Sequence, residues 1–298
     1  MMNKVLILLA SYNGEKFIER QITSILNQAN CIVDIIVSDD HSTDNTLKIL
    51  YRLADKNKNI KITINSLHKG FSHNFFNLFL IADIKNYDYI ALSDQDDFFL
   101  KNKFSKSIDL LNRYNADVIS SAVKCFGASK KILKQSNKMT KYDYLFEGGG
   151  QGNSFIMKKL FFEEFQLFFK NNYNEFSSFY FHDWLIYIYC RAKKHIWFFY
   201  NEPLTLYRIH NSNVAGDKYS FSGIHERLFK IISGWYMGQI ILANKISRLI
   251  DPKIPDLTKL NFFKFFLLIC LNGRRKISDR LILLFSYLLG FVKEKIIR

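Results

Sequence analysis

The sequence predicts an α/β fold built on a mostly parallel sheet. Apolar segments of strand length alternate with segments of helical periodicity through the first third of the chain, as right-handed βαβ units require. Two of the apolar segments end in paired aspartates, which predicts that both ends lie on one edge of one sheet. The chain of 298 residues is long enough for one large domain with an appendage.

The predicted elements follow one another closely along the chain. Val5–Leu9 is continuously apolar, which is the pattern of a parallel strand buried on both faces. In Glu15–Asn27 the apolar residues recur at helical spacing, and Ile32–Val37 returns to a strand pattern. The same signals predict helices at Thr43–Lys56 and Phe71–Ile84, and strands at Ile60–Asn65, Tyr89–Ser93 and Asp117–Ser121.

A cluster of aspartates follows the strand Tyr89–Ser93. Asp94, Asp96 and Asp97 stand within four residues, and unpaired charges beside a core carry a large desolvation cost. Mg²⁺ and Mn²⁺ prefer oxygen ligands, and a cation held by one or two carboxylates can take its remaining ligands from a diphosphate. The cluster therefore predicts a metal–diphosphate site. An acidic turn that caps the next helix is the alternative that these residues alone leave open.

Two other strand ends also carry polar side chains. Asp39 and Asp40 follow the second strand, and Ser11, Tyr12 and Asn13 follow the first. In open α/β sheets, ligands bind outside the carboxyl ends of the strands. We therefore expect three strand ends to converge on one crevice rich in oxygen ligands.

Several classes of site and partner are disfavoured. No Gly-x-Gly-x-x-Gly follows the first strand and no P-loop occurs, so a nucleotide would be held through carboxylates and metal. The formal charge of +15 indicates an anionic partner, but nucleic acid is not expected because no nucleic-acid-binding motif is present. The four isolated cysteines lack metal-binding spacing and are typical of reduced thiols in a cytosolic protein.

Three later motifs are candidates for the same site. The segment Glu147–Ser154 is rich in glycine, which lets a ligand approach the backbone closely, although a plain flexible loop has the same composition. Asp183 opens a predicted helix and could be only an N-cap there. Arg208 and His210 alternate on an extended segment, so both can face one side. Arg suits phosphate oxygens, and His suits a metal or a diphosphate, but a structural role is the commoner one for a lone His.

Together these motifs resemble the signatures of family 2 glycosyltransferases, which have the GT-A fold. The resemblance rests on Ala10–Asn13, Ser38–Thr46 and Ser93–Asp97, which keep the family's order, and it extends over roughly the first 215 residues. The Asp-Gln-Asp-Asp form of the last motif resembles the rhamnosyltransferase-like branch that builds bacterial surface polysaccharides. The resemblance implies a GT-A catalytic domain at residues 1–220 and becomes weak beyond it. For residues 221–298 the basic and apolar composition predicts a C-terminal helical, membrane-associating extension.

The resemblance also implies roles for individual residues. Asp183 would be the catalytic base, which takes a proton from the acceptor hydroxyl. The donor nucleotide would contact Ser11, Tyr12, Asn13, Asp39, Asp94 and Arg208. A divalent cation, Mn²⁺ or Mg²⁺, would bind Asp94, Asp96 and His210. The donor sugar or the acceptor would contact Asp97, Gly152, Asn153, His182 and Trp184.

The implied reaction is an inverting transfer of a sugar from a nucleoside-diphosphate donor. The acceptor hydroxyl would attack the anomeric carbon from the face opposite the diphosphate, and this single displacement inverts that carbon. The Asp-Gln-Asp-Asp form favours dTDP-rhamnose as the donor. The family implies a growing surface glycan on a polyprenyl-diphosphate lipid as the acceptor.

The tail differs in composition from the rest of the chain. The apolar runs Phe262–Leu271 and Leu281–Val292 flank a basic segment, which is typical of helices that lie in the membrane interface and are drawn to anionic lipid. The basic residues of that segment are Arg274, Arg275, Lys276 and Arg280. A helical hairpin packed on the protein, or on the second subunit of a homodimer, is the alternative. No run is long enough to span a bilayer and the N-terminal apolar run is too short for a signal peptide, so we expect a peripheral protein on the cytoplasmic face of the inner membrane.

Two functions of other classes are weaker alternatives. A nucleotidyltransferase would also use metal-bound carboxylates on an α/β sheet, but it usually needs a basic glycine-rich loop where this chain has Ser11–Glu15. A non-catalytic membrane scaffold would not need carboxylates at all three strand and helix ends.

Overall fold

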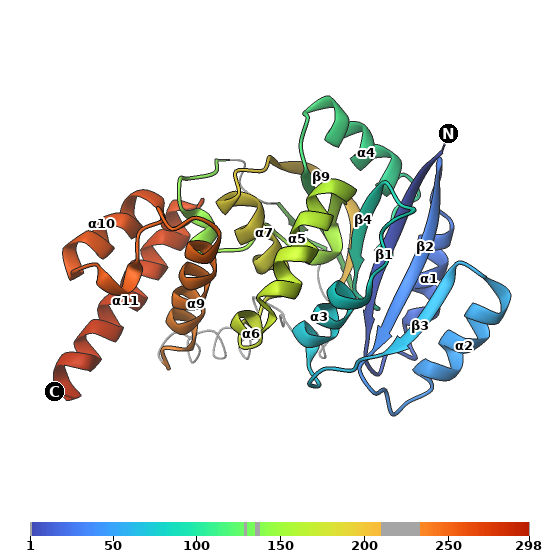
Figure 1. The fold of residues 1–298 in the computed structure, drawn as a ribbon, viewed down its shortest axis with the longest axis horizontal. Helices are drawn as coiled ribbons and strands as arrows, with labels where there is room; N and C mark the ends of the chain where they lie inside the picture. Colours follow the sequence, from blue (N-terminus) through green and yellow to red (C-terminus); the bar gives the residue numbers. More distant parts are fainter. Residues whose placement is uncertain (1, 128–129, 135–137, 210–232, 298) are drawn as a thin grey trace. The chain divides into compact units, whose positions relative to one another are not determined.

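The computed structural model describes residues 2–127, 130–134, 138–209 and 233–297 (Figure 1). Contacts between residues divide the chain into two compact units. The first, called here the sheet unit, consists of Met1–Gln135, Gly150–Asp183 and Lys194–Ile209. The second, the C-terminal unit, consists of Ser136–Gly149, Trp184–Lys193 and His210–Arg298. Two segments that precede residue 220 therefore belong to the C-terminal unit, and the expected domain boundary at 220 stays a prediction.

The sheet unit contains one mixed sheet with the strand order β3-β2-β1-β4-β8-β6-β9-β5. Strands β3, β2, β1 and β4 pair in parallel, whereas β8 runs antiparallel to both β4 and β6. Beyond β4 the sheet is mixed: β6 and β9 pair in parallel, whereas the pairs β4–β8, β8–β6, β6–β7 and β5–β9 are antiparallel. The expectation of a mostly parallel sheet therefore holds for β3, β2, β1 and β4 but not for the whole sheet. The strands are β1 (Asn3–Ser11), β2 (Cys31–Asp39), β3 (Ile60–Ile64), β4 (Tyr89–Ser93), β5 (Phe98–Phe99), β6 (Val118–Gly127), β7 (Ile132–Leu133), β8 (Phe155–Lys158) and β9 (Trp197–Ile209).

The helices of the sheet unit confirm the predicted order of elements up to β4, with ends that move by a few residues. The helix after the aspartate cluster, which was expected only in the alternative of an acidic capping turn, is α4, where Phe104, Ile108 and Leu111 have helical spacing and are buried. The helices are α1 (Ile18–Leu26), α2 (Thr46–Lys56), α3 (Phe71–Ile81), α4 (Lys103–Arg113), α5 (Lys159–Asn171) and α6 (Tyr173–Phe176).

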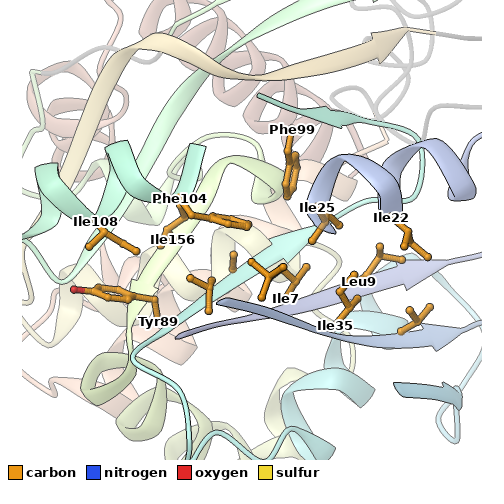
Figure 2. Close-up of a cluster of buried hydrophobic side chains, with 14 of the residues drawn as sticks. Ile7, Leu9, Ile22, Ile25, Ile35, Tyr89, Phe99, Phe104, Ile108 and Ile156 are labelled. Carbon is orange, nitrogen blue, oxygen red and sulfur yellow. The ribbon is translucent and has the colours of Figure 1, made fainter. Parts of the chain in front are cut away.

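One face of the sheet is covered by α1 and α4 (Figure 2). Ile7 and Leu9 of β1 point to this face together with Ile35 of β2, because alternate residues of neighbouring parallel strands share a face. Ile22 and Ile25 of α1 pack on them, and all five side chains are almost fully buried. Burying an aliphatic side chain of this size contributes about 1.5–3 kcal/mol, so this layer holds β1 and β2 rigidly side by side.

The opposite face is covered by α3 and α5 and is mostly aromatic. Helix α3 contacts β1 and β2, and α5 contacts β4 and β8. The ring of Phe79 on α3 lies 6.0, 5.4 and 5.6 Å from the rings of Phe162, Phe165 and Phe169 on α5. Both faces of the central strands are therefore buried, which explains the continuous apolar run of β1.

The C-terminal unit is helical. Helix α7 (His182–Ala192) begins in the sheet unit and continues into this one, which also contains α9 (Trp235–Ile250), α10 (Phe262–Asn272) and α11 (Ile277–Ile297). Both apolar runs of the tail form helices, as expected. In the described part of the chain, no helix combines the length and the apolar character needed to cross a bilayer.

The basic segment between α10 and α11 points partly inward. Arg275 is only 5% exposed, so the expectation that this residue faces anionic lipid is wrong. Arg274 donates to the hydroxyl of Tyr236, and Arg280 donates to the carbonyl oxygen of Cys270. Lys276 is exposed. These inward positions are favoured because a buried carboxylate without a partner carries a large desolvation cost, which a buried guanidinium offsets.

Candidate active site

The ends of β1 and β4 are tied together by one glutamine. Leu9 pairs with Ser93 in the parallel register of these strands, so the segments that follow them emerge side by side. The side chain of Gln95 accepts a hydrogen bond from the backbone N–H of Tyr12 and donates one to its carbonyl oxygen, both at 2.8 Å. A Cβ on Gly14 would lie 2.2 Å from Oε1 of Gln95, so a larger residue at this position would displace the Gln95 amide from Tyr12.

Asp39, at the end of β2, is enclosed by donors from its own strand edge. Its Oδ1 accepts from the backbone N–H of Ser42 at 2.7 Å. Its Oδ2 accepts from the hydroxyls of Ser11 and Ser42 at 2.8 and 2.7 Å. Asp39 has no exposed surface, and Oδ1 retains a second lone pair. The expected contact between Asp39 and a nucleobase stays a prediction.

Asp94 lies in a different electrostatic environment. Desolvation and the charges of Asp96 and Asp183 together raise the pKa of Asp94 to about 8, although the charge of Lys103 acts in the opposite direction. No hydrogen bond or ion pair from any described residue reaches the Asp94 carboxylate. Asp94 therefore lies within electrostatic reach of two other carboxylates, and a bound cation would relieve the repulsion that it experiences.

Asp97 is buried and joins three motifs. One carboxylate oxygen accepts from the side-chain amide of Asn153, and the other accepts from the backbone N–H of Arg208 at 3.4 Å. Burial and the charges of Asp96 and Asp94 hold the pKa of Asp97 well above its ordinary value. Nε of Arg208 also donates to the carbonyl oxygen of Asp96 at 3.1 Å. In this structure Asp97 anchors Asn153, and its expected contact with the sugar stays a prediction.

Lys103 is a functional candidate that the sequence reasoning missed. It is fully buried at the first residue of α4, where its Nζ donates to the carbonyl oxygen of Asn153 and to the hydroxyl of Thr205. Desolvation lowers the pKa of Lys103 to about 7, against the raising effect of Asp97 and Asp94. A cation at a helix N-terminus opposes the helix dipole, and this local conflict was the available signal.

The candidate base stands at the start of α7 beside the glycine-rich segment. His182 is buried with its ring stacked on Phe75 at 3.8 Å, and burial lowers the pKa of His182 to about 3, so the ring is neutral. A Cβ on Gly152 would lie 2.8 Å from Nε2 of His182 and 3.3 Å from Cβ of Asp183. Glycine at 152 therefore lets the segment pass directly over the helix start, with Asp183 partly exposed.

Two predicted site residues are not among the described residues of the sheet unit. Trp184 belongs to the C-terminal unit, where its indole Nε1 donates to the carbonyl oxygen of Tyr144 at 2.7 Å and the side chain is almost fully buried. His210 lies outside the described residues, so its expected role as a metal ligand is not tested. The other predicted residues belong to the sheet unit.

The residues present fit a hard divalent cation only in part. Among the described residues, no three His, Cys, Asp or Glu side chains converge as a complete set of ligands. Asp94 nevertheless lies within electrostatic reach of Asp96, and carboxylate oxygens of this kind suit Mg²⁺ or Mn²⁺ that shares its coordination shell with a diphosphate. The donor set therefore fits a metal that a substrate completes.

Comparisons with known proteins show which family the chain belongs to. Residues 6–181 match glycosyl transferase family 2. A dTDP-rhamnosyl transferase, RfbG, of Shigella flexneri is 36% identical over 80% of this chain and 84% of its own. The Escherichia coli UDP-Glc:alpha-D-GlcNAc-diphosphoundecaprenol beta-1,3-glucosyltransferase WfgD is 31% identical over 37% of this chain and 42% of its own.

A solved structure shows the same fold. The mannosyltransferase PcManGT of Pyrobaculum calidifontis, in complex with GDP-Man and Mn²⁺, superposes with a TM-score of 0.52 at 11% identity, over 98% of this chain and 87% of its own. This likeness supports the GT-A-like arrangement of the mixed sheet. From the family match and the extent of the likeness to RfbG, the chain belongs to glycosyl transferase family 2.

Proposed function

We propose that the protein transfers a sugar from a nucleoside diphosphate to a glycan hydroxyl with inversion at the anomeric carbon. The observation that carries this proposal is the proximity of Asp183 to Asp94: burial and the charge of Asp96 are the larger causes of the raised pKa of Asp94, and the charge of Asp183 adds to them. A single displacement needs a base for the incoming hydroxyl and a site for the outgoing diphosphate. The two carboxylates supply both within one unit.

Each side chain has a defined part in the displacement. Asp183 accepts the proton of the attacking hydroxyl, and its place in the first turn of α7 favours its negative charge. A divalent cation, when bound by Asp94 and Asp96, supplies Lewis-acid stabilisation of the departing diphosphate. Arg208 adds a guanidinium suited to phosphate oxygens.

The donor in this proposal is dTDP-rhamnose. The likeness to RfbG covers most of both chains and includes the Asp-Gln-Asp-Asp segment in which the sequence resembles rhamnosyltransferases. The lone pair left on Asp39 Oδ1 is available to accept the imide N–H of thymine once the loop at Ser42 adjusts.

A screen of nucleotide sugars tests this assignment. In the presence of Mn²⁺, dTDP-rhamnose should raise the unfolding temperature more than UDP-GlcNAc or GDP-mannose, because a ligand that binds only the native state stabilises it by mass action. Release of dTDP in the presence of a polyprenyl-diphosphate-linked glycan should follow. Equal responses to all three donors would remove the rhamnose assignment, and no response to any would remove the proposed function.

The acceptor in this proposal is a lipid-linked glycan, reached from the membrane surface on its cytoplasmic side. The name of WfgD specifies a substrate on diphosphoundecaprenol. Phe263, Leu267 and Leu271 are 78, 57 and 60% exposed and recur every four residues along α10, so they form one apolar face. Among the side chains of α11 that the structure describes, the exposed apolar ones are Ile277, Leu281, Ile282, Phe285 and Leu288. Such helices, with basic residues beside them, suit the interface of an anionic membrane.

Vesicle flotation separates this membrane surface from a dimer surface. Leu267→Glu should release the protein from vesicles of anionic phospholipid, while the control Leu160→Glu, at a leucine 71% exposed in the sheet unit, should leave it bound. Wild-type protein that ignores the vesicles and sediments as a dimer, which Leu267→Glu dissociates, would assign the apolar face to a second copy of the chain.

A further inference from the structure

The C-terminal unit contains a buried cluster of charged side chains. The side chain of Asp143 has no exposed surface, and its Oδ1 and Oδ2 form ion pairs with Arg191 at 2.7 Å and Arg275 at 3.0 Å. The hydroxyl of Tyr187 donates to the same carboxylate at 2.7 Å. A buried carboxylate of this kind is stable only while its partners remain in place.

Arg275 also holds the start of the glycine-rich segment. Its Nη2 donates to the carbonyl oxygen of Gly148 at 2.7 Å, and its Nε lies 3.4 Å from the carboxylate of Glu147. Gly148 in turn lies against Trp184, where an added Cβ would be 3.4 Å from the tryptophan Cβ. One guanidinium from the tail therefore binds both the segment that precedes Gly152 and the helix that follows Asp183.

The helix that Arg275 grips is the one that carries the candidate base. Nη1 of Arg275 donates to the hydroxyl of Tyr187 at 3.1 Å, and Tyr187 lies four residues after Asp183 on α7. Four residues along a helix are about 6 Å, roughly one turn. A shift or rotation of α7 at Tyr187 is therefore transmitted to Asp183 through continuous helix.

We propose that Arg275 is a positioning residue for sugar transfer, which sets the place of Asp183 by holding α7 and Gly148 to the buried Asp143. This inference rests on the proposed role of Asp183 as the base. The basic segment of the tail thus serves the reaction directly, besides any attraction to lipid. An error of about 1 Å in the position of a catalytic group can cost a factor of about 100 in rate.

The chain offers a matched control for this role. Arg280 belongs to the same basic segment, and among the described residues it bonds to the carbonyl oxygens of Cys270 and Arg274. Arg275→Met and Arg280→Met each remove one positive charge from the tail. Only the first removes a bond to α7 or to Gly148.

The test compares these variants in detergent, where membrane attachment does not limit the rate. Turnover is followed as dTDP released from dTDP-rhamnose with a polyprenyl-diphosphate-linked glycan, and the Kd for dTDP by calorimetry. Arg275→Met should lower kcat by about 10-fold or more with a Kd for dTDP within about twofold of wild type, whereas Arg280→Met should change neither. Arg275→Lys, which keeps the charge but not the bidentate geometry, should fall between them.

The Asp183→Asn background supplies the readout that a structural role would not move. A residue that acts through Asp183 loses its effect when the base is absent, so Arg275→Met should lower the residual rate of Asp183→Asn by less than about twofold. Where Arg275→Met fails to fold, Tyr187→Phe removes the bridging hydroxyl at smaller cost and should give the same pattern more weakly.

Three results would overturn the proposal. These are a loss in Arg275→Met that is undiminished in the Asp183→Asn background, a parallel loss of dTDP affinity, or an equal loss in Arg280→Met. A near-wild-type rate for Asp183→Asn alone would instead overturn the role of the base, which separates the two failures.

Discussion

The acidic residues at the end of β2 and those after β4 lie at the same edge of one sheet. They differ in the number of hydrogen-bond donors that reach their carboxylates. The carboxylate of Asp39 takes hydrogen bonds from Ser11 and Ser42. Asp40, next to it, accepts from the side-chain amide of Asn65 and from the backbone N–H of Gly70. No described donor reaches the carboxylate of Asp94, and the neighbouring negative charges raise its pKa.

This difference distinguishes carboxylates that stabilise the fold from carboxylates that are available to bind a ligand. A carboxylate whose oxygens are used by protein donors fixes the shape of a loop. Carboxylates that repel one another favour the binding of a cation, because the cation relieves their repulsion. Four substitutions can break or sharpen this contrast.

The largest effect is expected from Asp183→Asn. Asparagine keeps the size and the capping ability of the side chain but cannot accept a proton, so turnover should fall by about 10²–10⁴-fold. Binding of dTDP with Mn²⁺ should persist, because the donor contacts lie on the strand ends. Steady-state rates and calorimetry on the same preparation check both. Near-wild-type turnover would leave Asp183 as a cap.

Asp96→Ala should abolish metal-dependent donor binding without loss of stability. Removing one of several repelling carboxylates relieves the others, so the unfolding temperature of the metal-free protein should stay equal or rise. The control Asp109→Ala removes an exposed carboxylate from an i,i+4 pair on α4 and should change neither property. Unchanged Mn²⁺–dTDP affinity in Asp96→Ala would place the cation elsewhere.

In contrast to Asp96→Ala, Asp39→Ala should lower the stability of the protein. It removes the acceptor for three hydrogen bonds, and one hydrogen bond to a charged acceptor is worth about 1.5–3 kcal/mol. Binding of dTDP should weaken by a similar amount if Asp39 reads the base. Ser42→Ala sharpens the result, since it removes a donor and leaves the carboxylate: stability should fall while dTDP affinity holds. If Asp39→Ala binds dTDP with wild-type affinity, Asp39 stabilises the loop but does not contact the base.

Lys103→Met should have the smallest effect on ligand binding. It should strengthen the binding of Mn²⁺, whereas Asp96→Ala should weaken it. The substitution removes the buried positive charge that opposes the carboxylates of Asp94 and Asp97, so Mn²⁺ should bind the protein several-fold more tightly. Turnover should fall because the anchor of Asn153 is lost. Titration of Mn²⁺ by calorimetry decides the point, and weaker binding would show that Lys103 supports the metal site through structure rather than opposing it through charge.

The parallel half of the fold could be read from the sequence because its signals are local. Val5–Leu9 needs only to be apolar on both faces to be recognised as a buried strand, and Tyr89–Ser93 was predicted with the ends that the structure has. The antiparallel insertion of β8 depends on partners distant along the chain, which no local pattern encodes. The bounds of helix α4 were not predicted, because Ser105, Lys106 and Ser107 separate Phe104 from Ile108 and weaken the apolar pattern.

The sequence predicted which types of residue form the candidate site better than it predicted the contacts between them. The carboxylates at Asp39 and Asp94–Asp97 stand out because charges beside a core are costly. That Gln95 joins the ends of β1 and β4, or that Lys103 holds Asn153, depends on side chains meeting across long loops. The inward turn of Arg275 was hidden for the same reason, because a basic residue between two apolar runs has the same composition whether it faces lipid or Asp143.

The partners of Asp143 also impose an order on biosynthesis. Chains fold as they leave the ribosome, and Asp143 emerges well before Arg275. Until the tail is free, the carboxylate has Arg191 but not its second guanidinium, and Gly148 has no donor from Arg275. The elements around the candidate base should therefore reach their final packing only after the last stretch of the chain has been released. A message truncated near its 3′ end would yield a protein whose sheet is formed while α7 is not yet fixed.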